Sequence, residues 1–218
     1  MIKEGGMKAS KLGAPRLVFG VGINDADYAV TEWETIEVNG VRKRKLAWYC
    51  HYYQTWKNMI MRCYSPKFQE KWPTYKGCSV SEEWKIFSNF KLWMECQDFE
   101  GKQLDKDLLF EGNKVYGVET CAFVSKAVNM FTTDRGNDRG EWVIGVYWNK
   151  GAGKFMSRCS NPFTKKQEHL GWFIDELEAH KTWRKRKLEL AHMLSSEQTD
   201  ERVAKALIMK YTNYQIQS

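Results

Sequence analysis

Three stretches of alternating side chains, followed by one long helical pattern, constrain the fold more than any other part of this sequence. The alternating stretches are Val143–Trp148, Lys154–Cys159 and Gln167–Phe173. Alternation with a period of two is typical of strands that bury one face. The helical pattern runs from Asp175 to near Leu194, and we expect it to cover the apolar face of an antiparallel sheet through Ala179 and Trp183.

A polar, glycine-rich segment at 134–140 separates this module from a preceding part of a different kind. Near the N-terminus, Asn39-Gly40 follows the β-prone stretch Thr35–Val38 and predicts a hairpin turn. We therefore predict an α+β protein. Its predicted segments are a β-rich segment of no assigned role at 1–45, a scaffold at 46–133, a linker at 134–140, the sheet-and-helix module at 141–194 and a C-terminal helix at 195–218.

The scaffold segment carries four further predictions of local structure. Apolar residues at helical intervals predict a helix over Trp48–Tyr64, and Ser81 is a good N-cap for a second helix. Glu111–Asn113 reads as a tight turn between two short strands, and Ser125–Phe131 as a short helix. In the C-terminal segment, Glu197–Tyr214 predicts one more helix.

Charge and composition favour a polyanionic partner. Lys and Arg number 34 against 27 Asp and Glu, which gives a formal net charge of +7, and there are 10 Trp. Cations displace the counterions of phosphates, and aromatic rings stack on bases. No apolar run approaches the ~20 residues of a membrane span, and the N-terminus has no secretion signal. We expect a cytoplasmic chain. Its six cysteines include no Cys-x-x-Cys pair, and we expect most of them to be buried apolar side chains. A zinc site built from distant cysteines and His51 is the alternative.

The module at 141–194 resembles the DNA-binding domain of plant ethylene-response factors, the APETALA type, which also occurs in phage homing endonucleases. The motifs that carry the resemblance are Gly145-Val146, Gly153-Lys154-Phe155, Leu170-Gly171-Trp172-Phe173 and the helix with Glu178-Ala179-His180. In that family the exposed sheet face enters the major groove of DNA. The resemblance implies a DNA-facing set of Tyr147, Asn149, Lys150, Lys154, Arg158, Gln167 and His169.

Two features limit what this resemblance implies about DNA recognition by the module. Tyr147, Asn149 and His169 stand where the plant domains carry Arg, Arg and Trp, so only the docking mode carries over. A polar sheet face is also what solvent exposure alone would produce. In the cationic stretch at 182–187 we expect Arg184 and Lys185 to contact phosphates, with a solvated helix face as the alternative.

Residues 50–131 resemble phage HNH-endonuclease-like proteins. The ordered motifs are Trp56-x-x-Met59-x-x-Arg62-Cys63, Gly77-x-x-Val80-x-x-x-Trp84, Leu104-Asp105-Lys106-Asp107, Tyr116-x-x-Glu119-x-Cys121-x-x-Val124 and a closing Asn129. In this family a β-hairpin followed by a helix holds one divalent metal, which stabilises the leaving oxygen of a phosphodiester. The resemblance implies a site for Mg²⁺ or Mn²⁺ with Asp105, Asp107 and Asn129 as ligands.

One part of that family's motif is absent. A histidine normally stands beside the first acidic ligand and activates water, whereas this chain has Lys106 after Asp105 and Leu108 after Asp107. Lys106 is then the candidate for the missing catalytic group, and Glu119 is a further carboxylate. In the alternative interpretation, the aspartates form a surface ion pair with Lys106 and the hairpin is a structural remnant.

Together these features predict a phage-type, metal-dependent DNA endonuclease that acts in the cytoplasm of an infected bacterium. The C-terminal module would choose the site on double-stranded DNA and the middle scaffold would cut it. The alternatives are a catalytically inactive DNA-binding protein, such as a regulator or a phage factor acting on host processes, and a protein-binding inhibitor that reuses these folds. The sequence gives no prediction of the oligomeric state or the target site.

Overall fold

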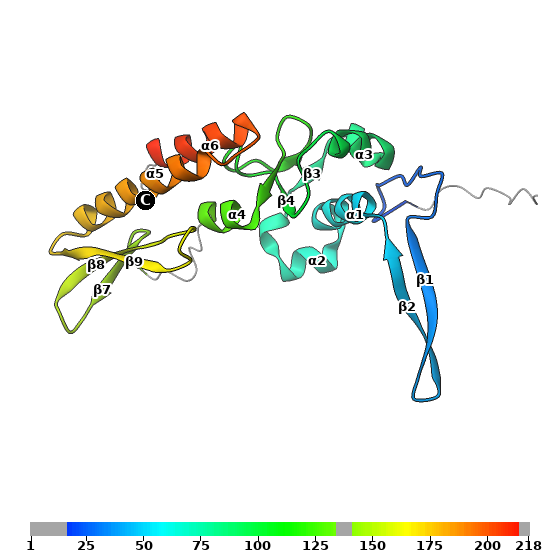
Figure 1. The fold of residues 1–218 in the computed structure, drawn as a ribbon, viewed down its shortest axis with the longest axis horizontal. Helices are drawn as coiled ribbons and strands as arrows, with labels where there is room; N and C mark the ends of the chain where they lie inside the picture. The colour runs from blue at the N-terminus through cyan, green and yellow to red at the C-terminus, as the bar shows by residue number, and fades with distance from the viewer. Residues whose placement is uncertain (1–16, 134–140, 214–218) are drawn as a thin grey trace, which may run out of the picture. The chain divides into compact units, whose positions relative to one another are not determined.

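The computed structural model describes residues 17–133 and 141–213 of the 218-residue chain (Figure 1). The described residues fall into two compact units. The first comprises 17–96 and 114–117, and the second comprises 97–113, 118–133 and 141–213. Helices and antiparallel strands occur together in a mixed architecture, which confirms the predicted α+β class.

The first unit begins with a two-stranded antiparallel ribbon, shown in blue in Figure 1. Strand β1 (Thr31–Val38) pairs with β2 (Val41–Tyr49) along its whole length. Asn39 and Gly40 have φ angles of 54° and 75°, the left-handed conformations that a two-residue hairpin turn requires. The predicted Asn-Gly hairpin is therefore confirmed.

The rest of the first unit is a small helical body around buried aromatic side chains. Its core includes Trp56, Trp84, Phe87 and Phe90, and the indole Nε1 of Trp56 donates to the Trp84 carbonyl at 2.7 Å. The elements around it are α1 (His51–Tyr64), α2 (Pro66–Lys71), η1 (Pro73–Tyr75), β3 (Ser79–Val80), η2 (Glu83–Lys85), α3 (Phe87–Glu95) and β5 (Val115–Tyr116).

Two predicted helix starts were wrong. The first helix starts at His51 because Trp48 and Tyr49 pair with β1 as part of a strand. The second starts at Phe87 because Ser81 opens a short 3₁₀ turn, in which its carbonyl accepts from the Trp84 amide at 3.0 Å. In both cases long-range pairing or a tight turn overrides the local helical pattern.

The second unit contains a strand–strand–helix motif. Strand β4 (Lys102–Asp105) pairs antiparallel with β6 (Ala122–Ser125), and α4 (Lys126–Thr132) follows directly. The Ser125 hydroxyl caps α4 by accepting from the Val128 amide at 3.2 Å, so the predicted short helix is confirmed. The predicted tight turn at 111–113 lies between two short strands, β4 and β5, as expected. These two strands do not pair with each other, because β5 pairs in parallel with β3.

The C-terminal part of the second unit holds the predicted three-stranded antiparallel sheet. Its strands are β7 (Val146–Asn149), β8 (Lys154–Ser160) and β9 (Gln167–Phe173), in that order. Helix α5 (Glu176–Ser195) covers one face, and α6 (Glu201–Thr212) packs on α5. The side chains of Asp175 and Asp200 cap the two helices, which fixes where each begins.

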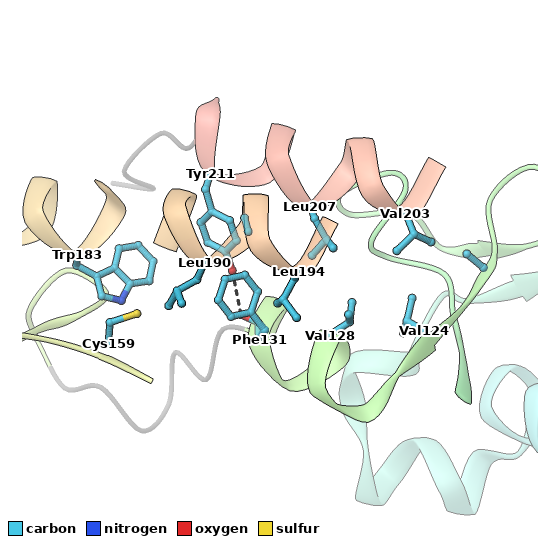
Figure 2. Close-up of a cluster of buried hydrophobic side chains, with 12 residues drawn as sticks. Val124, Val128, Phe131, Cys159, Trp183, Leu190, Leu194, Val203, Leu207 and Tyr211 are labelled. Atoms are coloured by element: carbon cyan, nitrogen blue, oxygen red, sulfur yellow. Dashed lines mark hydrogen bonds between the residues drawn. The ribbon is translucent and has the colours of Figure 1, made fainter. Parts of the chain in front are cut away.

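One hydrophobic core joins the strand–strand–helix motif to this C-terminal part (Figure 2). Its members come from β6, α4, β8, α5 and α6, and they are Ala122, Val124, Val128, Phe131, Cys159, Trp183, Leu190, Ala191, Leu194, Val203, Leu207 and Tyr211. The predicted segments 46–133, 141–194 and 195–218 thus contribute residues to a common interior.

A polar contact at the end of α4 reinforces this core, and we call it the carbonyl clamp. The backbone carbonyl of Phe131 accepts from the Lys187 ammonium at 2.6 Å. It also accepts from the Tyr211 hydroxyl at 2.9 Å (Figure 2). The Lys187 ammonium also lies 3.5 Å from the centre of the Phe131 ring. A buried cation at a helix C-terminus satisfies its last carbonyls, so the clamp stabilises α4 against α5 and α6.

Two general predictions concern cysteines and membranes. Cys50, Cys63, Cys78, Cys121 and Cys159 are buried, as expected for most of the cysteines, whereas Cys96 is exposed. Across the parts of the chain that the structure describes, no helix is long and apolar enough to traverse a bilayer.

Candidate functional site

Strand register gathers most of the predicted DNA-facing residues on one side of the three-stranded sheet. Across the strands, Tyr147 pairs with Met156, Asn149 with Lys154, and Arg158 with His169. Paired residues project to the same side. We call this side the outer face, and its members are Tyr147, Asn149, Lys154, Met156, Arg158, Ser160, Gln167, His169 and Trp172.

The outer face is open. Each of its nine members is exposed or half-buried, because α5 packs on the opposite side of the sheet. Its exposed members are Lys154, Ser160, Gln167, His169 and Trp172. Lys150, the remaining predicted residue of β7 and its turn, is exposed beside the face.

Contacts within the outer face orient several of these side chains. The Arg158 guanidinium stacks over the Tyr147 ring at 4.0 Å, which holds the cation flat against the sheet. Gln167 Nε2 donates to the Ser160 hydroxyl at 3.2 Å. The Asn149 side chain stabilises the turn between β7 and β8, because its Oδ1 accepts from the Ala152 amide at 2.9 Å.

A bulge in β9 adds residues that the sequence analysis missed. Ser157 pairs with Gly171 and Arg158 with His169, which leaves Leu170 as the extra residue. From this point the alternation is inverted, so Trp172 joins the outer face, where its ring lies 5.2 Å from that of His169. Glycine within a strand is a signal of such a bulge, and Gly171 has a φ angle of 137°.

The covered side of the sheet explains why these strands fold as they do. Ala179 and Trp183 of α5 are buried there, as predicted. A Cβ at Gly145 would lie 2.1 Å from Cγ of Trp183, so only glycine allows the strand to approach the indole. Glu168 binds Arg186 of α5 through two hydrogen bonds of 2.7 and 3.0 Å, and this lowers the pKa of Glu168 to about 2.

The two predicted phosphate contacts on α5 differ in their surroundings. Arg184 donates through Nε to the Tyr211 carbonyl at 3.0 Å and through Nη2 to the Thr212 carbonyl, so it caps the end of α6. Lys185 is exposed to solvent. Lys185 is therefore the better placed of the two to contact a phosphate, because its ammonium is exposed and Arg184 is engaged with α6.

The other candidate site lies on the strand–strand–helix motif, where β4 ends at Asp105. Its Oδ1 accepts from the backbone amides of Asp107 at 2.9 Å and Leu108 at 2.7 Å. Burial raises the pKa of the Asp105 carboxyl, and these two hydrogen bonds oppose that rise. Asp105 thus organises the loop that follows β4.

Lys106 is buried and holds the same loop from inside. Its ammonium donates to the Asp107 carboxylate and, at 2.9 Å, to the Asn113 carbonyl. The Asn113 side-chain amide in turn donates to the Lys106 carbonyl at 2.8 Å. The predicted surface pair is therefore half-buried, with an interior cation and an exposed carboxylate.

Asn129 faces the hairpin from α4. Its Nδ2 donates to Oε1 of Gln103 at 2.7 Å, and Gln103 lies two residues before Asp105 on the same side of β4. All three predicted metal ligands are therefore engaged with protein groups, namely a pair of backbone amides for Asp105, Lys106 for Asp107 and Gln103 for Asn129.

The predicted metal ligands make contacts with the protein that a bound cation would have to replace or share. Mg²⁺ is usually held by one or two carboxylates in near-octahedral geometry. Burial disfavours the charged form of Asp105, and Lys106 pairs with Asp107. Among residues 17–133 and 141–213, no three His, Cys, Asp or Glu side chains are grouped so that they could hold a metal ion.

Comparison of the chain with protein-family models, with curated proteins and with solved structures gave no match.

Proposed function

We propose that this chain is a double-stranded DNA-binding protein and that the outer face of the three-stranded sheet is its contact surface. The observation that carries the proposal is this uncovered antiparallel face, which combines Lys154 and Arg158 with hydrogen-bonding side chains and the exposed Trp172 ring. Cations supply affinity for phosphates, and polar side chains on a strand can reach base edges in the major groove.

We expect different residues of the outer face to contact the phosphates and the base edges of DNA. Lys154 is exposed at the start of the central strand β8 and suits a phosphate, since an ammonium acts as a point charge. Gln167 and His169 are exposed on the edge strand β9 and suit base edges. Arg158, farther along β8, pairs across the strands with His169 and is pre-oriented by Tyr147, so it loses little conformational entropy on binding.

The test is a DNA-binding isotherm measured by fluorescence anisotropy over a series of salt concentrations. We expect Lys154→Gln to weaken binding and to lower the slope of log K against log salt by about 1, as loss of one phosphate contact does. Lys181→Gln is the matched control, because Lys181 is equally cationic but lies on α5 and pairs with Glu178 at 2.6 Å. Affinity that does not change with salt would contradict the proposal.

DNA cleavage is the second candidate, and the strand–strand–helix order of β4, β6 and α4 is the observation that favours it. That order is the one the HNH-like resemblance implies for the segment that ends at Asn129. We derive no catalytic step, because the acidic side chains are engaged as described above.

Cleavage is tested by incubating supercoiled plasmid with the chain and Mg²⁺ or Mn²⁺. Metal-dependent nicking that Asp105→Asn abolishes and Asp98→Asn retains would establish the activity; Asp98 is an exposed aspartate of the same unit, paired with Lys102. If the plasmid stays intact under conditions where the chain binds DNA, the cleavage activity is refuted and only the binding function is supported.

A further inference from the structure

The ribbon of β1 and β2 separates its charges by strand. Strand β1 carries Glu32, Glu34 and Glu37 and has no Lys or Arg. Strand β2 carries four consecutive cations, Arg42-Lys43-Arg44-Lys45, and has no Asp or Glu. In a two-stranded ribbon each strand has one unpaired edge, so this ribbon has an acidic edge and a basic edge.

The basic strand is open to solvent on both faces. All nine residues of β2 are exposed, so the rest of the first unit covers neither face of it. Cross-strand contacts hold the ribbon together, with the Arg44 guanidinium 5.4 Å from the centre of the Trp33 ring and Lys45 3.5 Å from Glu34. An isolated two-stranded hairpin is only marginally stable in water, and ribbon binding to a partner would stabilise it further.

We propose that β2 is a second DNA-contacting surface, which lies with its basic edge along the phosphates of a duplex. This inference rests on the proposed DNA-binding function and extends it to the first unit. The ligand is recognised by charge, because four adjacent cations in an exposed strand complement a row of phosphates.

Alternation along the strand places cations on both sides of the ribbon. Successive residues of β2 alternate between the two faces, so Arg42 and Arg44 project to one side and Lys43 and Lys45 to the other. Two cations on the same side are about 6.6 Å apart, because a strand rises about 3.3 Å per residue. Each side of β2 therefore offers two neighbouring cations to the phosphates of a duplex.

Another copy of this chain is a less suitable occupant. The acidic edge of one ribbon would pair with the basic edge of the next, which is a head-to-tail contact that does not close into a dimer. The formal net charge of +7 also makes copies of the chain repel each other, while it attracts a polyanion. Charge therefore favours DNA.

The experiment replaces Arg42, Lys43, Arg44 and Lys45 together with glutamine in the full chain. Anisotropy with duplex DNA is then measured between about 50 and 200 mM salt. Loss of two to four phosphate contacts should make the salt-induced weakening about 10- to 100-fold smaller than in the unmodified chain. The control removes the same charge from four exposed lysines of the first unit, Lys57, Lys67, Lys71 and Lys76.

Two further variants keep the test independent of ribbon folding. Arg42→Lys with Arg44→Lys retains the charges and should retain the salt dependence. Glu32→Gln with Glu34→Gln and Glu37→Gln removes the acidic strand's repulsion and should tighten binding.

The outcomes separate the two proposals. If the unmodified chain shows no salt-dependent DNA binding, the proposed function fails, and this inference fails with it. If Lys154→Gln lowers the slope but the glutamine ribbon variant does not, only the ribbon inference is overturned. Concentration-dependent self-association that the ribbon variant abolishes, with unchanged DNA affinity, would assign the ribbon to a second copy instead.

Discussion

Replacement of Gly145 by alanine should destabilise the second unit by two separable mechanisms. Gly145 has a φ angle of 82°, a conformation that costs an alanine about 1–2 kcal/mol. The added Cβ would also lie 2.1 Å from Cγ and 2.2 Å from Cδ1 of Trp183, a buried side chain that cannot move without disturbing the core. Overpacking of this kind costs about 1–3 kcal/mol, so the total expected loss is about 2–5 kcal/mol.

Gly153→Ala is the matched control in the same sheet. Gly153 also has a positive φ, of 60°, but a Cβ there would meet nothing within 4 Å. It therefore reports the backbone cost alone. The difference between the two variants isolates the contact between residue 145 and Trp183.

Urea unfolding followed by circular dichroism measures both variants. We expect the midpoint of Gly145→Ala to fall well below that of Gly153→Ala, and the DNA affinity of Gly145→Ala to fall with it, because Tyr147 and Asn149 follow directly on β7. Equal midpoints for the two variants would refute the claim that close approach to Trp183 requires glycine at 145.

Three further predictions follow from individual contacts. Glu168→Gln should make the free energy of unfolding depend less on pH in acid. Pairing with Arg186 lowers the folded-state pKa of Glu168 to about 2, so the pair stabilises the fold above the ordinary pKa of Glu168 and this stabilisation is lost as pH falls toward 2. Acid titration followed by circular dichroism measures the difference. Trp56→Phe should cost about 1–3 kcal/mol in urea unfolding, because it leaves the buried Trp84 carbonyl without the indole donor. Trp172→Ala should weaken DNA binding without changing its salt slope, since a ring contributes no counterion release.

The sequence predicted the C-terminal sheet well because its signals are local. The range Gln167–Phe173 matches β9 at both ends, and α5 begins directly after Asp175, within one residue of the predicted start. The inversion at Leu170 was not predicted, because a bulge depends on how β9 pairs with β8 and not on its own alternation. Trp172 was missed for that reason.

Elsewhere the deciding interactions are long-range. The pairing of β3 with β5 joins residues 79–80 to 115–116, and no local pattern in either segment indicates the other. Likewise, the cationic stretch at 182–187 looks uniform in sequence, yet Lys187 is buried, Arg184 caps α6 and Lys185 stays in solvent. Tertiary packing gives these neighbouring cations their different environments.

The carbonyl clamp has a consequence for the connectivity of the chain. Lys187 and Tyr211 donate hydrogen bonds to the carbonyl of Phe131 in the last turn of α4. In the sequence, residues 134–140 follow soon after this turn and precede the three-stranded sheet. Because α4, α5 and α6 share one interior, noncovalent packing also joins the parts of the chain on either side of residues 134–140. A chain cleaved in that segment should stay assembled, and fragments 1–136 and 137–218, expressed together, should purify as a stoichiometric pair.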